Sequence, residues 1–192
     1  GVNAHVVMEE YVSPDMKDYL KGQNKIFVLS ADNLETLVSY AEKLSKYVST
    51  EHVDKVLAHV AYTTQIGREA RTYRLAAIAP DAKALIQTLD NFVSSQKGGD
   101  NLLFQNTDES PEFEGNSPVV TGKTQNKEQL LEIANAWVHG EQIEWKKMYS
   151  GLKMYRMSLP TYPFDKKSYW THTEAAVKDV EQTFEVVKKP NQ

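Results

Sequence analysis

The chain has 192 residues, 41% of them hydrophobic and 25% charged, which is typical of one globular domain with appended segments and excludes a disordered protein. Its formal net charge of −4 argues against a general nucleic-acid binder, which needs a basic surface facing phosphates. The absence of cysteine excludes disulfides, thiolate zinc sites and a cysteine nucleophile.

The sequence also carries information about location. No apolar run is long enough to span a bilayer, and no secretory signal pattern opens the chain, so we expect a cytoplasmic protein. Because the sequence starts at Gly1 in the middle of a pattern, without an initiator methionine, we expect it to be a piece of a larger protein.

Four short segments predict strands. Residues 1–11 contain the β-branched pair Val6-Val7, and a polar connector over residues 12–24 separates this segment from the rest. The other three are apolar runs of strand length, at residues 25–31, 72–80 and 101–105.

Apolar residues at helical spacing predict three helices between these strands. The first begins after Asp32, which we predict to be its N-cap, with Glu35 as the capping-box partner. The second is expected to end at Gly67, in the left-handed conformation that glycine adopts freely. The third follows Asp81, whose charge is favourable near a helix N-terminus.

The chain changes character after the third strand. Residues 106–125 are rich in glycine, proline and acidic side chains, and they predict an exposed loop. Residues 126–150 contain a fourth amphipathic helix, which is capped by Asn126 with Gln129, closed by Gly140 and expected to pack on the preceding domain at residues 25–105.

Residues 151–170 predict an extended strap. Pro160 and Pro163 each lack an N–H and keep the preceding residue extended, while the density of aromatic side chains is too high for a free linker. We expect Phe164 and Trp170 to be buried against the helices. The predicted anchors of the strap are Leu159, Pro160, Tyr162, Pro163, Phe164, Tyr169 and Trp170. Residues 171–192 form a thinly apolar tail.

These elements predict an α/β fold in which a small three-stranded sheet, antiparallel or mixed, packs on helices, with a C-terminal extended strap wrapping back over it. No catalytic constellation is apparent. Ser30 lacks the flanking glycines of a nucleophile elbow. No histidine has partners at metal-ligand spacing, so we predict structural roles for His5, His52, His59, His139 and His172. We therefore predict no catalytic residue, no cofactor and no metal.

Three separated stretches resemble modular polyketide synthases. GVNAHVVMEE, residues 1–10, is similar to the last strand of a ketosynthase, and KIFVLSADNLETLVSYAEKL, residues 25–44, is similar to the linker domain that follows ketosynthases. The stretch from Trp137 to Trp170, with its Leu-Pro-Thr-Tyr-Pro-Phe motif at residues 159–164, resembles the segment after the acyltransferase.

One departure from the common pattern is informative. In the usual synthase an acyltransferase of several hundred residues lies between the linker domain and the closing segment, whereas here only residues 107–125 separate them. The resemblance is therefore to modules that lack an acyltransferase and are loaded by a separate one acting in trans.

The resemblance implies a non-catalytic scaffold for polyketide, and hence antibiotic, biosynthesis. Residues 1–11 would be the terminal strand of the ketosynthase of the same chain, and the strap would reach that ketosynthase. The fragment is expected to be monomeric, although the parent would be a homodimer through its ketosynthase.

The resemblance further suggests docking of a trans-acting malonyl acyltransferase, with the acidic loop as candidate site through Asp108, Glu109, Glu112 and Glu114. The alternative is that this loop is only the scar of a lost domain. Two other functions stay open: a stand-alone protein-interaction module, and an acyl-transferring enzyme, for which the sequence shows no nucleophile.

Overall fold

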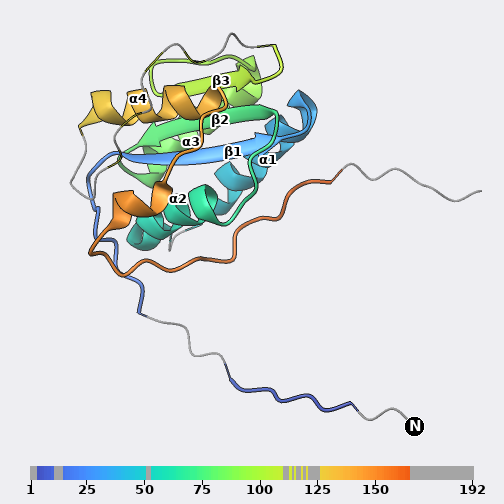
Figure 1. Ribbon diagram of the computed structural model, residues 1–192, viewed down its shortest axis with the longest axis vertical. Coiled ribbons are helices and arrows are strands. Elements are labelled where there is room, and N and C mark those ends of the chain that lie inside the picture. The colour runs from blue at the N-terminus through green and yellow to red at the C-terminus, as the bar shows by residue number, and fades with distance from the viewer. Residues whose placement is uncertain are drawn as a thin grey trace, which may run out of the picture.

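The computed structural model describes residues 4–10, 15–50, 53–109 and 126–164, together with residues 113, 115, 118 and 120. In these ranges a three-stranded sheet lies between α-helices (Figure 1). The strands are β1 (Lys25–Ala31), β2 (Tyr73–Ala79) and β3 (Leu102–Asn106). The helices are α1 (Leu34–Val48), α2 (Leu57–Ile66), α3 (Ala82–Ser95) and α4 (Lys127–Val138), with short 3₁₀ helices η1 (Val53–Val56) and η2 (Trp145–Tyr149).

The sheet is antiparallel, in the order β1-β2-β3. Along the first pair, Lys25 lies opposite Ala79 and Ala31 lies opposite Tyr73. Helices connect these neighbouring strands: α1, η1 and α2 lie between β1 and β2, and α3 lies between β2 and β3. The predicted α/β fold is confirmed, and of the two sheet arrangements left open the antiparallel one is observed.

Helices cover both faces of the sheet. Alternate residues of a strand point to opposite faces. Phe27 and Leu29 of β1 pack in a cluster with α1 and α3, whereas Ile26 and Val28 pack in a second cluster with α4. All four side chains are buried. A strand that is buried on both faces explains why residues 25–31 form a continuous apolar run instead of alternating with polar residues.

Helix α2 covers the outer edge of β1. The Val28 N–H donates to Thr64 Oγ1 at 3.3 Å, and Gln65 Nε2 donates to the carbonyl oxygen of Ile26 at 2.8 Å. These buried side chains occupy edge groups that another strand would otherwise pair with. Residues of α2 from Leu57 to Val60 are buried consecutively, so this helix is enclosed on several sides.

Two predicted helix ends differ from the structure. The N-cap of α1 is Asn33, whose side chain accepts from the Thr36 N–H at 2.8 Å, whereas Asp32 uses its carboxylate to bind Arg71. Helix α2 does end at Gly67, but with φ −97° and therefore outside the left-handed region. A Cβ at Gly67 would lie 2.6 Å from the Thr63 carbonyl oxygen, so close approach rather than positive φ requires glycine there.

The capping of α4 agrees with the prediction. Asn126 accepts from the Gln129 N–H, and Gln129 accepts from the Asn126 N–H, which completes a capping box. At the other end His139 is the C-cap, and Gly140 has φ +105°. Only glycine adopts this backbone conformation without strain.

The described N-terminal residues 4–10 contain no strand in this chain. Val6, Val7 and Met8 are 80%, 96% and 88% exposed, so these apolar side chains have no packing partners here. Residues 4–10 form no strand here, and no described strand lies beside them, so the identification of residues 1–11 as the terminal strand of a ketosynthase stays a prediction.

Candidate functional site

The strap follows η2 and lies along α2 (Figure 1). Three residues of α2 and its C-terminal turn, His59, Thr63 and Arg68, bind strap backbone groups in chain order. One helical turn rises about 5.4 Å, and two extended residues span about 6.6 Å. An extended segment parallel to a helix can therefore meet it about once per turn.

His59 is the first of these contacts, and its side chain is completely buried. The Tyr155 N–H donates to His59 Nδ1 at 3.0 Å, and His59 Nε2 lies 3.0 Å from the carbonyl oxygen of Lys17. This pattern assigns the ring proton to Nε2, which donates to Lys17. The Tyr155 ring also stacks on the imidazole, with ring centroids 6.0 Å apart.

Thr63 and Arg68 provide the next two contacts. The Met157 N–H donates to Thr63 Oγ1 at 2.9 Å, and that hydroxyl donates in turn to the His59 carbonyl oxygen at 2.6 Å. Arg68 Nη2 donates to the Pro160 carbonyl oxygen at 3.3 Å. The backbone of the strap is therefore hydrogen-bonded by side chains of the domain and not by a neighbouring strand. This agrees with its prolines, which lack the N–H that a strand ladder needs.

Apolar burial accompanies these bonds. Leu159 is 8% exposed and belongs to the cluster formed with α1 and α3, against which Met157 and Tyr162 also pack. Arg156 and Ser158 between them are exposed. The alternation shows that this part of the strap lies on the domain with one side inward.

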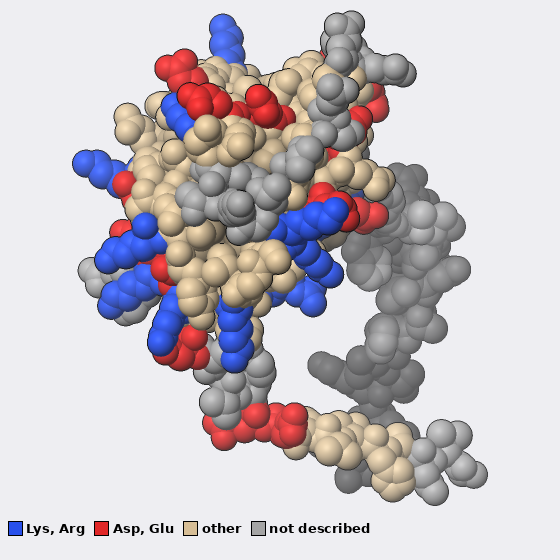
Figure 2. Space-filling view, turned by 60° about the vertical axis from the view of Figure 1, so that its left-hand side comes forward, with Lys and Arg blue, Asp and Glu red and all other residues tan. Residues whose placement is uncertain are grey.

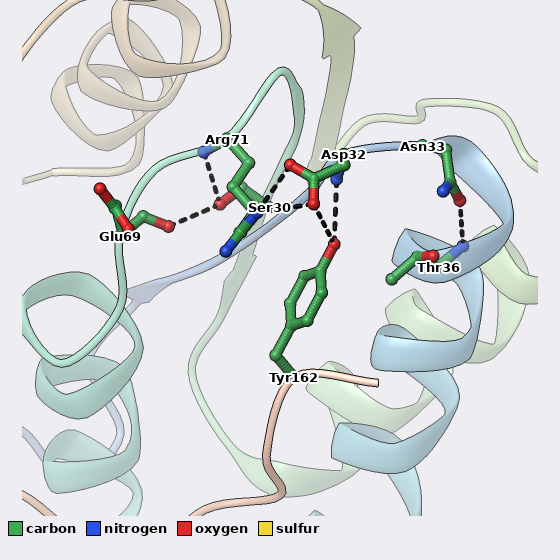
Figure 3. A network of polar contacts seen from close by, with 7 residues as sticks. All are labelled: Ser30, Asp32, Asn33, Thr36, Glu69, Arg71 and Tyr162. Atoms are coloured by element: carbon green, nitrogen blue, oxygen red, sulfur yellow. Dashed lines mark hydrogen bonds and ion pairs between the residues drawn. The ribbon is translucent and has the colours of Figure 1, made fainter. Parts of the chain in front are cut away.

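Tyr162 is the last of the described strap residues that hydrogen-bonds the domain through its side chain (Figure 3). Its hydroxyl donates to Asp32 Oδ2 at 3.0 Å and accepts from the Asp32 N–H at 3.1 Å. Arg71 Nη1 lies 2.7 and 2.6 Å from the two carboxylate oxygens of Asp32, and its guanidinium lies 4.5 Å from the Tyr162 ring centroid. The Arg71 N–H is held by Ser30 Oγ at 3.0 Å.

The electrostatics around Tyr162 favour the charged forms of Asp32 and Arg71. The hydrogen bond from Arg71 lowers the pKa of Asp32, and the same bond raises the pKa of Arg71. Partial burial raises the pKa of Tyr162, so its hydroxyl stays protonated as the donor. Because Asp32 and Arg71 are partly exposed, the network can orient the strap but contributes little to global stability.

The predicted strap anchors divide into three groups. Leu159 is buried, and Pro160, Tyr162 and Pro163 are half-buried. The expectation that Phe164 is buried against the helices is wrong: it is 71% exposed and touches Tyr162, with ring centroids 4.8 Å apart. Among the residues that the structure describes, no element covers it. Tyr169 and Trp170 lie outside the described residues.

The acidic loop is described only in part. Asp108 and Glu109 are exposed and follow β3 in a turn, in which the Glu109 N–H donates to the Asn106 carbonyl oxygen at 3.2 Å. Glu112 and Glu114 lie outside the described residues. The ring of Phe113 lies 6.3 Å from that of His139, so this loop contacts the C-terminal end of α4.

Buried polar groups elsewhere serve the fold. The Tyr149 hydroxyl donates to Gln65 Oε1 at 2.8 Å, and burial raises the pKa of this phenol. Within the described ranges no group of histidine, aspartate and glutamate side chains could hold a metal ion. No helix of the described part is long and apolar enough to cross a membrane. Figure 2 shows basic side chains crowding the lower half of one face of the domain.

Comparison with known proteins gives the family. Residues 28–96 match the model of the RhiE-like, KS-MAT linker domain. Residues 28–96 belong to this family of linker domains of polyketide synthases. The resemblance stated from the sequence, to a post-ketosynthase linker of a module without its own acyltransferase, is confirmed.

Relatives extend this similarity over the rest of the chain. Polyketide synthase PksL of Bacillus subtilis is 35% identical over 182 residues, 91% of this chain and 4% of that protein. Polyketide synthase PksM of the same organism is 34% identical over 100% of this chain and 5% of that protein. The linker chain therefore spans only a small part of these relatives.

Solved structures agree. The ketosynthase from module 6 of the Bacillus subtilis bacillaene synthase matches with a TM-score of 0.65 and 32% identity, over 84% of this chain and 28% of that one. Ketosynthase twelve of the Bacillus amyloliquefaciens bacillaene synthase matches with a TM-score of 0.59 and 30% identity, over 78% of this chain and 24% of that one.

Sequence reasoning did not find the residues of α2 that bind the strap. His59, Thr63 and Arg68 were not predicted as its partners, although a structural role was expected for His59. One signal was present: polar His59 and Thr63 are one turn apart in a helix whose other residues are mostly apolar. Buried polar side chains need hydrogen-bond partners.

Proposed function

We propose that this linker chain is a non-catalytic scaffold that positions the ketosynthase of its module. The observation that carries the proposal is the strap, which is bound along α2 through Tyr155, Met157 and Pro160 and then presents an exposed Phe164. An aromatic side chain that is 71% exposed at the end of a well-anchored segment is suited to packing on a neighbouring domain.

The N-terminal arm supports the same proposal. Val6, Val7 and Met8 are exposed and apolar, as expected for a strand whose sheet belongs to the ketosynthase. The similarity to solved ketosynthase chains covers 84% of this chain in one case, which places regions of this kind in the same polypeptide as a ketosynthase in those proteins. Two covalent arms would then reach one neighbour from the same domain.

A condensation assay on the parent protein tests the scaffold role. The strap variant Leu159→Ala with Tyr162→Ala should lower the rate of ketosynthase condensation, because the strap no longer fixes the orientation of the two domains. The matched control is Ser158→Ala, at an exposed strap position between the anchors. An unchanged rate in the double variant, with the strap shown to be released, would contradict the proposal.

Docking of a trans-acting malonyl acyltransferase is the finer part of the proposal. The exposed carboxylates Asp108 and Glu109 offer a small charged contact on the loop that stands where other modules carry an acyltransferase. A partner that serves many modules needs only a small polar interface, and charge would mainly speed its encounter.

Titration of the chain with its cognate acyltransferase tests this docking. Affinity should fall as salt rises, because exposed charges are screened beyond about 8 Å at physiological ionic strength. The variant Asp108→Asn with Glu109→Gln should weaken binding, whereas Glu132→Gln on the exposed side of α4 should not. No detectable binding at low salt leaves the scaffold role alone, and salt-insensitive binding that survives neutralisation overturns the acidic loop as the site.

A further inference from the structure

The two arms of the chain meet on one buried side chain. Lys17 lies in the connector, before the sheet, and Tyr155 lies in the strap, more than a hundred residues after Lys17. Both residues nevertheless bind His59. Figure 1 shows the connector and the strap passing close to each other beside α2. Both contacts involve main-chain atoms of the arms, so they do not depend on the identity of the side chains there.

The chemistry of imidazole suits this double contact. A neutral ring has one donor and one acceptor on opposite sides. His59 Nε2 donates to the Lys17 carbonyl oxygen, and Nδ1 accepts from the Tyr155 N–H, each at 3.0 Å. The ring is 0% exposed while both arms are bound, so neither hydrogen bond competes with water in this structure.

Each arm has a further anchor of its own. The connector is held by Lys25 of β1, whose buried Nζ donates to the carbonyl oxygens of Gln23 and Pro80, each at 3.0 Å, and lies 3.8 Å from Asp18 Oδ2. In the strap, Thr63 holds the Met157 N–H. Among the hydrogen bonds of the described residues, those of His59 are the ones that join the connector to the strap through a single side chain.

We infer that His59 is a positioning residue that couples the two arms, so that releasing the strap from His59 also loosens the connector. In the proposed scaffold, the connector arrives from the ketosynthase and the strap returns to it. The coupling through His59 would fix the position of these two segments relative to each other. Its biological meaning rests on the proposed function, but the coupling is a property of this chain alone.

Residue-resolved amide hydrogen exchange on the 192-residue chain tests the inference. The reporters in the connector are the Tyr19 and Leu20 amides, which are bonded to Lys17 and Asp18, and the reporters in the strap are the Tyr155 and Met157 amides. His59→Phe keeps an aromatic ring and removes both polar contacts. It should speed exchange at both sets of reporters by about tenfold, while amides of β2 keep their rates.

Two further variants separate coupling from simple packing. Thr63→Val keeps the shape of the side chain and removes the hydroxyl that holds the Met157 N–H and donates to the His59 carbonyl oxygen, but it leaves both ring contacts of His59 in place, so Met157 should exchange faster and the connector should not. Tyr155→Pro removes both the N–H that binds His59 and the ring that stacks on it, without changing His59 itself. It should therefore speed amide exchange in the connector, which the hydrogen bonds of the described residues link to Tyr155 only through His59. The Tyr155→Pro variant also tests the coupling if the His59→Phe variant does not fold.

The outcomes are distinct. Connector amides at the wild-type rate in both His59→Phe and Tyr155→Pro would overturn the coupling, as would equal acceleration of the connector in Thr63→Val. Neither result involves a ketosynthase, so the scaffold proposal would stand or fall separately, on the condensation assay.

Discussion

The two faces of the sheet are built from different parts of the chain. The helices that cover one face, α1 and α3, lie in the continuous segment that matches the linker-domain family, residues 28–96, and the strap adds Leu159 at the margin of the same cluster. The face covered by α4 and η2 comes from beyond the acidic loop and outside that segment. Solvent is excluded from both faces, since Phe27 on one side and Ile26 on the other are each 0% exposed.

The segment after the loop therefore completes the core of the linker domain. The side chains Ile133, Ala134 and Trp137 of α4 pack on Ile26, Val28 and other residues of the sheet, and without α4 this apolar face would be wet. The loop at residues 107–125 is therefore an excursion between two parts of one core. A short loop or a long insertion can occupy that place, because closure entropy grows slowly with loop length.

The largest expected effect tests whether the two faces are equivalent. Trp137→Ala on the α4 face and Phe92→Ala on the α3 face should each lower the free energy of unfolding by about 3–5 kcal/mol, because both side chains are at most 5% exposed. Chemical denaturation followed by circular dichroism measures both, with Glu132→Ala on the exposed side of α4 as the control. A small effect of Trp137→Ala, with a native β-sheet signal, would mean that α4 is only an accessory.

The next effect extends the comparison to the strap. Leu159→Ala should cost about 2–3 kcal/mol, less than a central core residue, because Leu159 lies at the margin of the cluster and is 8% exposed. Phe164→Ala should leave stability unchanged in this chain, since the side chain is exposed. Equal losses of stability in the two variants would contradict the distinction between Leu159, which is packed on the domain, and Phe164, which is exposed.

A smaller effect probes the polar contact that joins η2 to α2. Tyr149→Phe removes the hydroxyl that donates to buried Gln65 and should cost about 1–3 kcal/mol, because an acceptor is left without its partner. Tyr19→Phe, at an exposed tyrosine, is the control. A neutral result for Tyr149→Phe would show that Gln65 finds another donor.

The smallest effect concerns pH at the end of the strap. The pKa of Asp32 is lowered in the folded state, so its contribution is present above the ordinary carboxyl pKa of about 3.9 and is lost as pH falls through the lowered value. The Tyr162 ring signals in an NMR titration should therefore shift only in strong acid. The shift should disappear in Asp32→Asn, and its persistence there would assign it to another group.

Much of the domain was predictable because its signals are local. The run at residues 25–31 coincides with β1, and the capping pair Asn126 and Gln129 marks the start of α4. Burial on both faces makes a strand uniformly apolar, and a capping box involves residues three apart, so a single stretch carries each signal.

The wrong predictions concern features of the structure that depend on contacts between residues far apart in the sequence. Asp32 and Asn33 are both good N-caps, and the choice between them depends on Arg71 and Tyr162, which occupy the Asp32 carboxylate from 39 and 130 residues away. Phe164 looks like a core residue in the sequence, but it lies beyond Tyr162, the last of the described strap residues that the domain binds through a side-chain hydrogen bond. The sequence showed an anchored strap and could not show which of its aromatic side chains the domain buries.

The distance between the ketosynthase and this domain most directly tests the scaffold role. The chain has no cysteine, so Glu132→Cys on α4 introduces one labelling site here, and a second label is placed on the ketosynthase surface of the parent protein. Pulsed electron paramagnetic resonance should give one narrow distance distribution, which broadens when Leu159 and Tyr162 are both replaced by alanine. A broad distribution in the parent, or a narrow one that survives release of the strap, would contradict the account.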